Sequence, residues 1–442
     1  MKKAITLLVG ALLLLGGATP APASLRQYLA EARAHNDELA AARAEAQASR
    51  EGVRQAGVLP DPVLGLEYYV ESVETRTGPQ EAAVSLSQRL PWPTKLSLQK
   101  QEVRQQSAMA DSRLQEVALL VERRVKEAYV EYAFNNEALA IAVEGALLLG
   151  YFESVALTSY SAGRLDYSSV LQIQVEQARL EERRRSLADQ NGPLQGRLNA
   201  LLGAPRDTAR SLPLRLPVIT LNQKAAGLYE VARAQSPKLA GVAAAVHKAK
   251  TSRAMAEKDF YPDLALSLKT IVTGAAEYGD PPDSGRNPVI AGISMNIPLF
   301  RDRRHGAVAA RQEEVRAAQG QQGQERRDLD AAIDQGLYRY RDAVQRQTLY
   351  RESIIPRIRQ QVEVGLQAFE GGNQTVFALL EAEKNLLEFQ LSQRQALADQ
   401  ALEVARLEEL VGITLAQWDH ATADTEAADR GQPPALNEAG LP

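Results

Sequence analysis

Four short segments of the chain alternate apolar and polar residues with a period of two. The first places one set of side chains on one face, namely Leu64, Leu66, Tyr68 and Val70. A second segment around residues 84–90, a third from Leu264 and a fourth from Val289 repeat this alternation. A period of two with one apolar face is typical of a β-strand that is apolar on one side only.

Long helices are predicted outside these four strands. Residues 25–57 are rich in the helix-forming residues Ala, Glu, Gln and Arg, and Pro60 ends the pattern. Residues 94–158 and 303–367 are mostly helical in pattern, and a helix of some 60 residues would be roughly 90 Å long. Leucine-type residues recur every seven positions over 173–201, which indicates coiled-coil packing. Antiparallel helical hairpins are therefore predicted, with Gly-containing turns at 161–164 and 370–373.

The chain repeats this order of segments. Tyr160-x-x-Gly163 through Leu201-Leu202-Gly203 runs parallel, without gaps, to Phe369-x-x-Gly372 through Leu410-Val411-Gly412. Such repetition predicts two similar halves. The first repeat spans 24–202, with a strand hairpin at 62–91 and a helical hairpin at 94–202. A connector at 203–222 leads to the second repeat at 223–413, with a strand hairpin at 262–299 and a helical hairpin at 303–413. The acidic tail at 414–442 is predicted to be disordered.

The N-terminus indicates export. Two lysines precede an apolar run from Ala4 to Leu15, and small residues follow up to Ala23, so residues 1–23 are interpreted as a signal peptide. No later segment is expected to span a bilayer as a helix. The chain contains no cysteine, which excludes disulfides, thiolate metal sites and a lipid-bearing cysteine. The net charge of −4 offers no basic patch for nucleic acid.

The number of strands has a consequence for assembly. Membrane barrels need at least eight strands, and an open sheet edge in hydrocarbon leaves backbone amides unpaired. Four strands per chain are therefore expected to be shared among several copies. Small or polar residues such as Ser85, Ser87 and Ser294 suit a wet lumen opposite a lipid-facing exterior. Together with water-exposed helices, this pattern favours a conduit.

The ordered duplication of these motifs resembles the TolC-type outer membrane efflux family. The turns at Gly163 and Gly372, the closing Leu201-Leu202-Gly203 and the corner at 296–300 carry the resemblance, which covers about residues 25–413. It implies a homotrimer in the outer membrane whose four strands per protomer form a twelve-stranded barrel, with a helical tunnel in the periplasm. It also implies a periplasmic adaptor and an inner-membrane transporter of RND type as partners, with lipid around the barrel.

The stretch Leu90-Pro91-Trp92-Pro93-Thr94-Lys95 is similar to the heavy-metal branch of that family rather than to its drug branch. The cargo thus stays open between metal cations and drugs. A periplasmic coiled-coil adaptor that never enters a membrane is the alternative function. Adaptors carry further domains rich in short strands, so four long strands favour the duct.

The resemblance places a periplasmic gate at the two hairpin turns. Relatives carry an acidic residue six positions after the turn glycine, but Ser169 and Ala378 occupy those positions here. Glu381 matches a second acidic position, where three like charges would attract cations. A solvated glutamate near a helix start is the alternative.

Four further residues belong to the predicted gate. Gly163 and Gly372 are expected to form the turns and to admit a partner's helical tip. Arg164 and Asp166 are candidates for a latch to the second hairpin, or else an exposed pair of little energetic weight.

Catalytic motifs are missing from the sequence. It contains no phosphate-binding glycine loop, no H-E-x-x-H and no G-x-S-x-G. Its four histidines lie far apart, and only three methionines follow Met1, so neither a metal site nor a cofactor is predicted. An exported hydrolase has no residues to support it. The chain is predicted not to be an enzyme.

Overall fold

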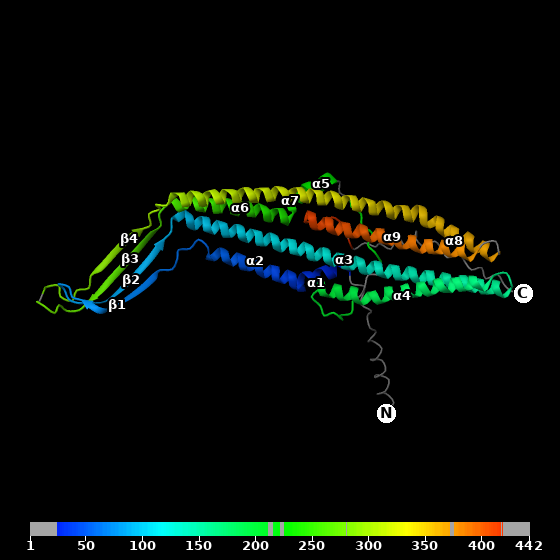
Figure 1. Cartoon of the computed structure of the whole chain (residues 1–442), viewed down its shortest axis with the longest axis horizontal. Coiled ribbons are helices and arrows are strands. Elements are labelled where there is room, and N and C mark those ends of the chain that lie inside the picture. The colour runs from blue at the N-terminus through cyan, green and yellow to red at the C-terminus, as the bar shows by residue number, and fades with distance from the viewer. Residues whose placement is uncertain are drawn as a thin grey trace, which may run out of the picture. The chain divides into compact units, whose positions relative to one another are not determined.

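The computed structural model describes residues 24–210, 215–221, 225–279, 281–371, 375–416 and 418. The predicted signal peptide, Gly372 and nearly all of the predicted tail lie outside these residues. The described chain is mostly helical and contains a four-stranded antiparallel sheet (Figure 1). The predicted fold class of long helices with four strands per chain is confirmed in these elements.

The chain divides into two compact units, which cut across the two sequence repeats. The first unit comprises Met1–Ala40, Val117–Ser236 and Leu329–Pro442. The second comprises Ala41–Glu116 and Pro237–Asp328. Each unit thus takes segments from both halves of the sequence.

The sheet belongs to the second unit. It consists of β1 (Val63–Val73), β2 (Gln80–Leu90), β3 (Leu264–Thr273) and β4 (Val289–Met295), in that spatial order. All neighbouring strands are antiparallel, and Leu86 on β2 pairs with Leu64 on one side and with Leu268 on the other. Because side chains alternate along a strand, this register places most of the apolar residues of the four strands on one face.

The first predicted helix is wrong in one respect, because the structure divides it. The segment forms α1 (Leu25–His35) and α2 (Asp37–Gln55), separated by Asn36. The Asn36 side-chain oxygen accepts a hydrogen bond from the Leu39 amide at 2.9 Å, so Asn36 caps α2. The second half has the same break between α5 (Ala225–Gln235) and α6 (Pro237–Glu257), where a proline takes the first helical position.

The long helices begin directly after the strand-to-helix corners. Helix α3 spans Pro93–Ser161 and α4 spans Tyr167–Leu201. Helix α7 (Arg301–Leu349) leads through a π-helical turn, η2 (Tyr350–Ile354), into α8 (Ile355–Glu370). Pro356 explains this turn, since a proline in a helix lacks the amide that would bond to the preceding turn. Helix α9 spans Val376–Val411.

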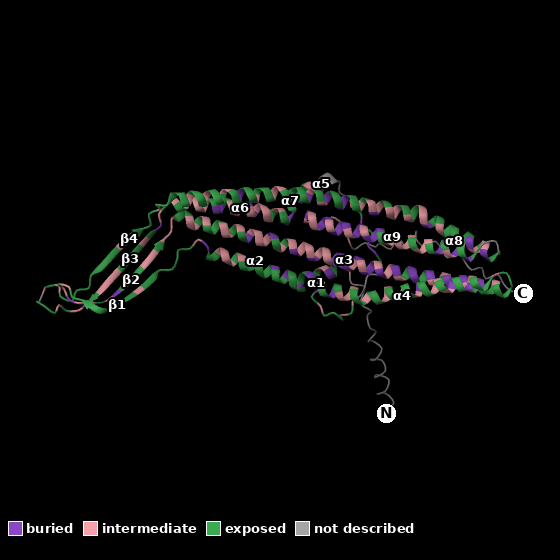
Figure 2. Ribbon diagram, viewed as in Figure 1, coloured by how far each residue is buried: buried purple, intermediate pink, exposed green. Residues whose placement is uncertain are grey.

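Two hydrophobic clusters hold the first unit together. One contains Phe152 of α3, Ile173 of α4, Phe369 of α8 and Leu379 of α9, so the two helical hairpins pack against each other. The other contains Val130, Leu397 and Val404, and it receives Leu216 and Ile219 from the connector. Figure 2 shows buried residues along α9 and the second half of α3. The predicted coiled-coil packing accounts for this distribution.

A buried ion pair also belongs to the first unit. Lys126 on α3 contacts Glu408 on α9, and both side chains are almost fully buried. Glu408 also accepts hydrogen bonds from the Leu415 amide at 2.8 Å and from the Trp418 indole at 3.2 Å. These bonds supply the partners that a buried carboxylate needs.

No helix that could span a bilayer is expected from the sequence, but α3 is apolar enough to do so by length and composition. Helix α3 contains an 18-residue window with a mean hydropathy of 1.6, of which 28% is buried. A core helix of a protein that never enters a membrane can reach the same hydropathy over the same length. The hydropathy of α3 therefore does not by itself place it in a membrane.

Candidate functional site

The sheet has an exposed apolar face. We define the apolar sheet face by the residues Leu64, Leu66, Tyr68, Val70, Val84, Leu86, Leu264, Leu266, Leu268, Val289, Ile293 and Met295. Leu66 is 74% exposed and Val70 is 90% exposed. Figure 2 shows strands β1 and β4 largely as exposed. A contiguous apolar surface of this kind marks a contact with a membrane or with another protein.

The opposite face of the sheet is polar. Ser85 lies between Gly65 and Lys269 in the register, and Ser87 lies beside Ser267. The Lys269 ammonium forms an ion pair with the Glu67 carboxylate at 2.7 Å. The sheet is therefore amphipathic across its thickness, as the sequence predicts for a barrel with a wet lumen.

The two outer strands leave the sheet open. Strands β1 and β4 each have one neighbouring strand within the part of the chain that the structure describes. Their outer edges carry backbone groups that a further strand can pair with. The sheet is thus equipped to continue into another copy.

Asp263 fixes the junction between the sheet and the helices. Its carboxylate accepts hydrogen bonds from the Trp92 amide at 3.0 Å, from Arg89 at 3.0 Å and from Lys95 at 3.1 Å. Burial alone would raise the pKa of Asp263, but these hydrogen bonds outweigh it and the pKa is lowered. The backbone amide of Asp263 also bonds to the Asn296 side chain. Asp263 therefore connects the end of β2 to the start of β3 through its carboxylate, and the segment after β4 to the start of β3 through its backbone amide.

Two aromatic residues lie at the junction between the sheet and the helices, just before β3. Phe260 ends the short 3-10 helix η1 (Lys258–Phe260), and Tyr261 precedes β3. The Tyr261 ring stacks on Trp92 with 5.0 Å between centroids, and the Phe260 ring contacts His305 at the same centroid distance. Both residues thus pack at the sheet-to-helix junction, whereas Tyr68 is exposed on the apolar sheet face.

The first helical hairpin has the turn that its sequence predicts. Gly163 has a φ of +69°, and its amide donates to the Tyr160 carbonyl at 2.9 Å. Asp166 is the N-cap residue of α4, without a hydrogen bond from its side chain to the helix. Arg164 and Asp166 are both exposed, and the described residues provide no ion-pair partner for either. Their predicted latch remains a prediction.

The second turn is described only in part. Glu370 ends α8 and α9 begins at Val376, while Gly372 lies outside the described residues. Glu381 is exposed on the second turn of α9, and Ala378 before it is half-buried. Val170 of α4 and Val376 of α9 belong to the same hydrophobic cluster. The starts of α4 and α9 therefore both contribute to this cluster.

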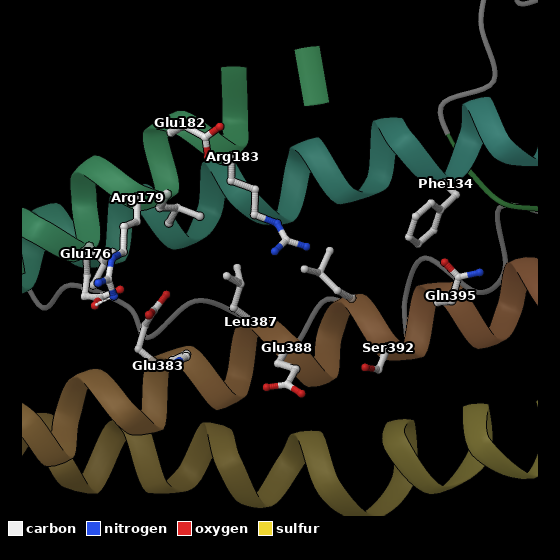
Figure 3. A pocket seen from close by; sticks show the side chains of 14 residues that line it. Phe134, Glu176, Arg179, Glu182, Arg183, Glu383, Leu387, Glu388, Ser392 and Gln395 are labelled. Carbon is white, nitrogen blue, oxygen red and sulfur yellow. Dashed lines mark hydrogen bonds and ion pairs between the residues drawn. The ribbon is translucent and has the colours of Figure 1, made fainter. Parts of the chain in front are cut away.

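Glu383 is a candidate that sequence reasoning missed. It is 6% exposed and lines a cavity of about 620 Å³ between α4 and α9 (Figure 3). Burial, followed by the nearby charge of Glu176, raises the pKa of Glu383 to about 7. The available signal was positional, because Glu383 occupies a place in the buried stripe of α9 between Leu379 and Leu387.

The described residues contain no candidate metal site. They contain no group of three or more His, Cys, Asp or Glu side chains arranged to hold a metal ion. The exposed apolar sheet face, the open sheet edges and the hairpin turns are thus the features from which function can be argued.

Comparisons with known proteins agree with this geometry. The model of the outer membrane efflux protein family matches residues 228–413. No curated protein matches the chain. Solved structures with a similar fold include the outer membrane protein VceC from Vibrio cholerae, with 18% identity and a TM-score of 0.73 over 88% of this chain and 96% of that one.

Two further solved structures are similar to the same degree. CusC, a protein that changes conformation as it folds and forms a transmembrane channel, has 14% identity and a TM-score of 0.74. The match covers 89% of this chain and 93% of that one. The MtrE outer membrane channel of Neisseria gonorrhoeae, in its open state, has 14% identity and a TM-score of 0.71 over 88% and 89%. At these identities the likeness establishes the fold.

Proposed function

Through residues 228–413 this chain is a member of the outer membrane efflux protein family, and we propose that it is the exit duct of a tripartite efflux system. In this role it passively conducts substrates from an inner-membrane pump and a periplasmic adaptor to the exterior. The chain is an outer-membrane protein, and its structural neighbours are channels rather than enzymes. Energy for transport comes from the pump.

The amphipathic sheet is the observation that carries this proposal. Its apolar face is exposed over all four strands, and its other face carries serines and the Glu67–Lys269 ion pair. A sheet with one apolar and one polar face suits lipid on one side and a water-filled lumen on the other. A coiled-coil adaptor that stays in the periplasm has no lipid for such an apolar face to contact.

The open edges of β1 and β4 support assembly into a homotrimer. Three copies of a four-stranded sheet supply twelve strands, which exceeds the minimum for a membrane barrel. Closing the barrel pairs every edge and removes the unpaired backbone groups that hydrocarbon does not tolerate. Each protomer then faces lipid with its apolar sheet face.

The hairpin turns are proposed to form the periplasmic gate. Glu381 is exposed near the start of α9, and three copies would place three carboxylates around one axis. Gly163 gives the first hairpin a narrow tip, and Arg164 and Asp166 extend from it. The adaptor and an RND-type pump are the proposed partners at this end. The cargo stays open between drugs and metal cations.

Conductance tests this proposal directly. The full-length protein, purified in detergent and reconstituted in planar bilayers, is expected to give discrete conductance steps and to migrate as an SDS-resistant oligomer. A water-soluble monomer without conductance would eliminate the duct and favour the adaptor. In the same recordings, Glu381→Gln is expected to weaken cation preference and block by multivalent cations. Unchanged selectivity would remove Glu381 from the gate.

A further inference from the structure

The cavity beside Glu383 has no role in conduction as proposed above. It lies between α4 and α9, and α3 contributes to its wall (Figure 3). All three segments belong to the first compact unit. Its volume of about 620 Å³ falls within the range of small-molecule sites.

The wall of the cavity is apolar over much of its extent. Leu149 of α3, Leu180 of α4 and Leu387 of α9 line it. Gly145 lets the three helices approach closely, because a Cβ at this position would lie 3.2 Å from Leu180, Leu387 and Glu383. The cavity thus offers an apolar surface for the body of a ligand, with a carboxyl group set into it.

Glu383 is the buried carboxylic acid in this wall. It is 94% buried, and within the described residues no side chain or amide donates a hydrogen bond to it. A buried carboxylate without a partner is costly, and the gain from an approaching cation is correspondingly large. In Figure 3 the Glu383 side chain extends from α9 toward α4, into the space between the helices.

The other charged groups around the cavity are satisfied or exposed. Arg179 forms an ion pair with Glu176 at 2.7 Å. The exposed lining groups are Glu182, Arg183, Lys384 and Glu388, and α3 contributes none. Arg183 extends between the helices in Figure 3, but its exposure lets water solvate it. Among these charged lining groups, Glu383 is the one that is buried and has no hydrogen bond or ion pair in the described residues, and its carboxylate would attract a positive charge.

We propose that this cavity binds an amphipathic organic cation, with its ammonium group on the Glu383 carboxylate and its apolar body against Leu149, Leu180 and Leu387. Charge-assisted hydrogen bonds between an ammonium and a carboxylate are the strong ones. The raised pKa of Glu383 adds a signature, since the bound cation favours the ionised carboxyl. The site does not depend on conduction, so it stands or fails separately from the proposed duct.

Binding of a fluorescent probe to the full-length protein in detergent tests the proposal. The probe is 2-(1-naphthyl)ethylammonium, and 2-(1-naphthyl)ethanol is its uncharged counterpart. Partition into detergent is measured without protein and subtracted. We expect the cation to bind at one site per chain and at least tenfold more tightly than the alcohol. We also expect this preference to grow as the pH rises from 6 to 8, because Glu383 ionises.

Matched variants identify the group responsible. Glu383→Gln is expected to abolish the preference for the cation, while Glu383→Asp retains part of it. Glu363→Gln, which removes an exposed carboxylate on α8, is expected to leave it unchanged. Arg183→Gln is expected to strengthen cation binding, because it removes a competing positive charge. Unfolding temperatures of the variants confirm that each is folded.

Three outcomes overturn the proposal. Equal affinity for the cation and the alcohol would show that the cavity recognises no charge. Unchanged cation affinity in a folded Glu383→Gln variant would place the site elsewhere. An assembled oligomer that binds neither probe would show that another side chain, from Arg183 or from a second copy, already fills the cavity.

Discussion

At the scale of single residues, Glu383 links burial to pH. Its pKa is raised to about 7 by burial and by Glu176, so the folded state holds this proton more tightly than the unfolded state. The stabilising contribution of the protonated form is complete below pH ~4.5 and is lost as the pH rises through about 7. The charged groups lining the same cavity are Glu176, Arg179, Glu182, Arg183, Lys384 and Glu388.

Glu383→Gln is therefore expected to flatten the pH dependence of stability. Glutamine stays neutral, so the variant should not lose the up to about 3 kcal/mol that the wild type loses between pH ~4.5 and ~7. Unfolding of the detergent-solubilised protein at a series of pH values measures this difference. Glu363→Gln, on the exposed face of α8, serves as the control. Parallel curves for Glu383→Gln and the wild type would contradict the assignment.

Gly163 tests the turn of the first hairpin by backbone conformation alone. Its φ is +69°, and an added Cβ would meet nothing within 4 Å, so Gly163→Ala is expected to cost about 1 kcal/mol through strain. Gly150 in α3 also has open space at its Cβ but lies within a helix, where alanine stabilises by about 0.5–1 kcal/mol. Unfolding temperatures should move in opposite directions for the two variants. A shift in the same direction would count against the role of Gly163.

The sequence predicts residues whose role is local and misses those whose role depends on burial. Gly163 was predicted because a glycine between two long helical patterns indicates a turn. Glu383 was missed because its meaning comes from α3 and α4, which are distant in sequence and surround it in the fold. The role of Asp263 was missed for the same reason, because its bonds to Arg89 and Lys95 join segments more than 160 residues apart.

At the scale of elements, an arginine is expected to affect assembly differently at two neighbouring positions of β3, because they lie on opposite faces of the sheet. Leu266 lies on the apolar sheet face and Ser267 on the opposite face. Leu266→Arg is expected to cost about 2–4 kcal/mol in the membrane, because the arginine would face hydrocarbon. Ser267→Arg, on the polar face, should assemble at near wild-type levels. Recovery of SDS-resistant oligomer from outer membranes measures both variants, and equal recovery would reject the assigned lipid-facing side.

Periodicity predicts strands better than it predicts helix ends. The four strands can be predicted because a strand with one apolar face has an apolar residue at every second position. The breaks at Asn36 and Ser236 were missed because composition favours helix on both sides, while one residue marks each break. The Asn36 side chain caps α2, and Pro237 takes the first position of α6. The π-helical turn before Pro356 also depends on one residue within a long favourable segment.

At the scale of the whole molecule, the strand order determines which edges are free to meet. Strands β1 and β4 are the outer strands of the described sheet, so they are not neighbours within one chain. In a closed barrel of identical copies, β1 of one protomer must pair with β4 of the next. Association of this kind is heterologous and closes into a ring. Two equivalent edges meeting face to face would instead give a dimer.

Cross-linking distinguishes these arrangements, because the native chain contains no cysteine. Glu67→Cys on β1 and Ile290→Cys on β4 place single thiols on exposed positions of the polar sheet face. A bis-maleimide long enough to bridge several residues of register is expected to join copies only in the double variant, because each bridge needs one thiol from β1 and one from β4. The covalent products should end at three copies, since three protomers close the proposed twelve-stranded ring. Cross-linked dimers of either single variant would mean that like edges meet, and products beyond three copies would require a larger or an open assembly.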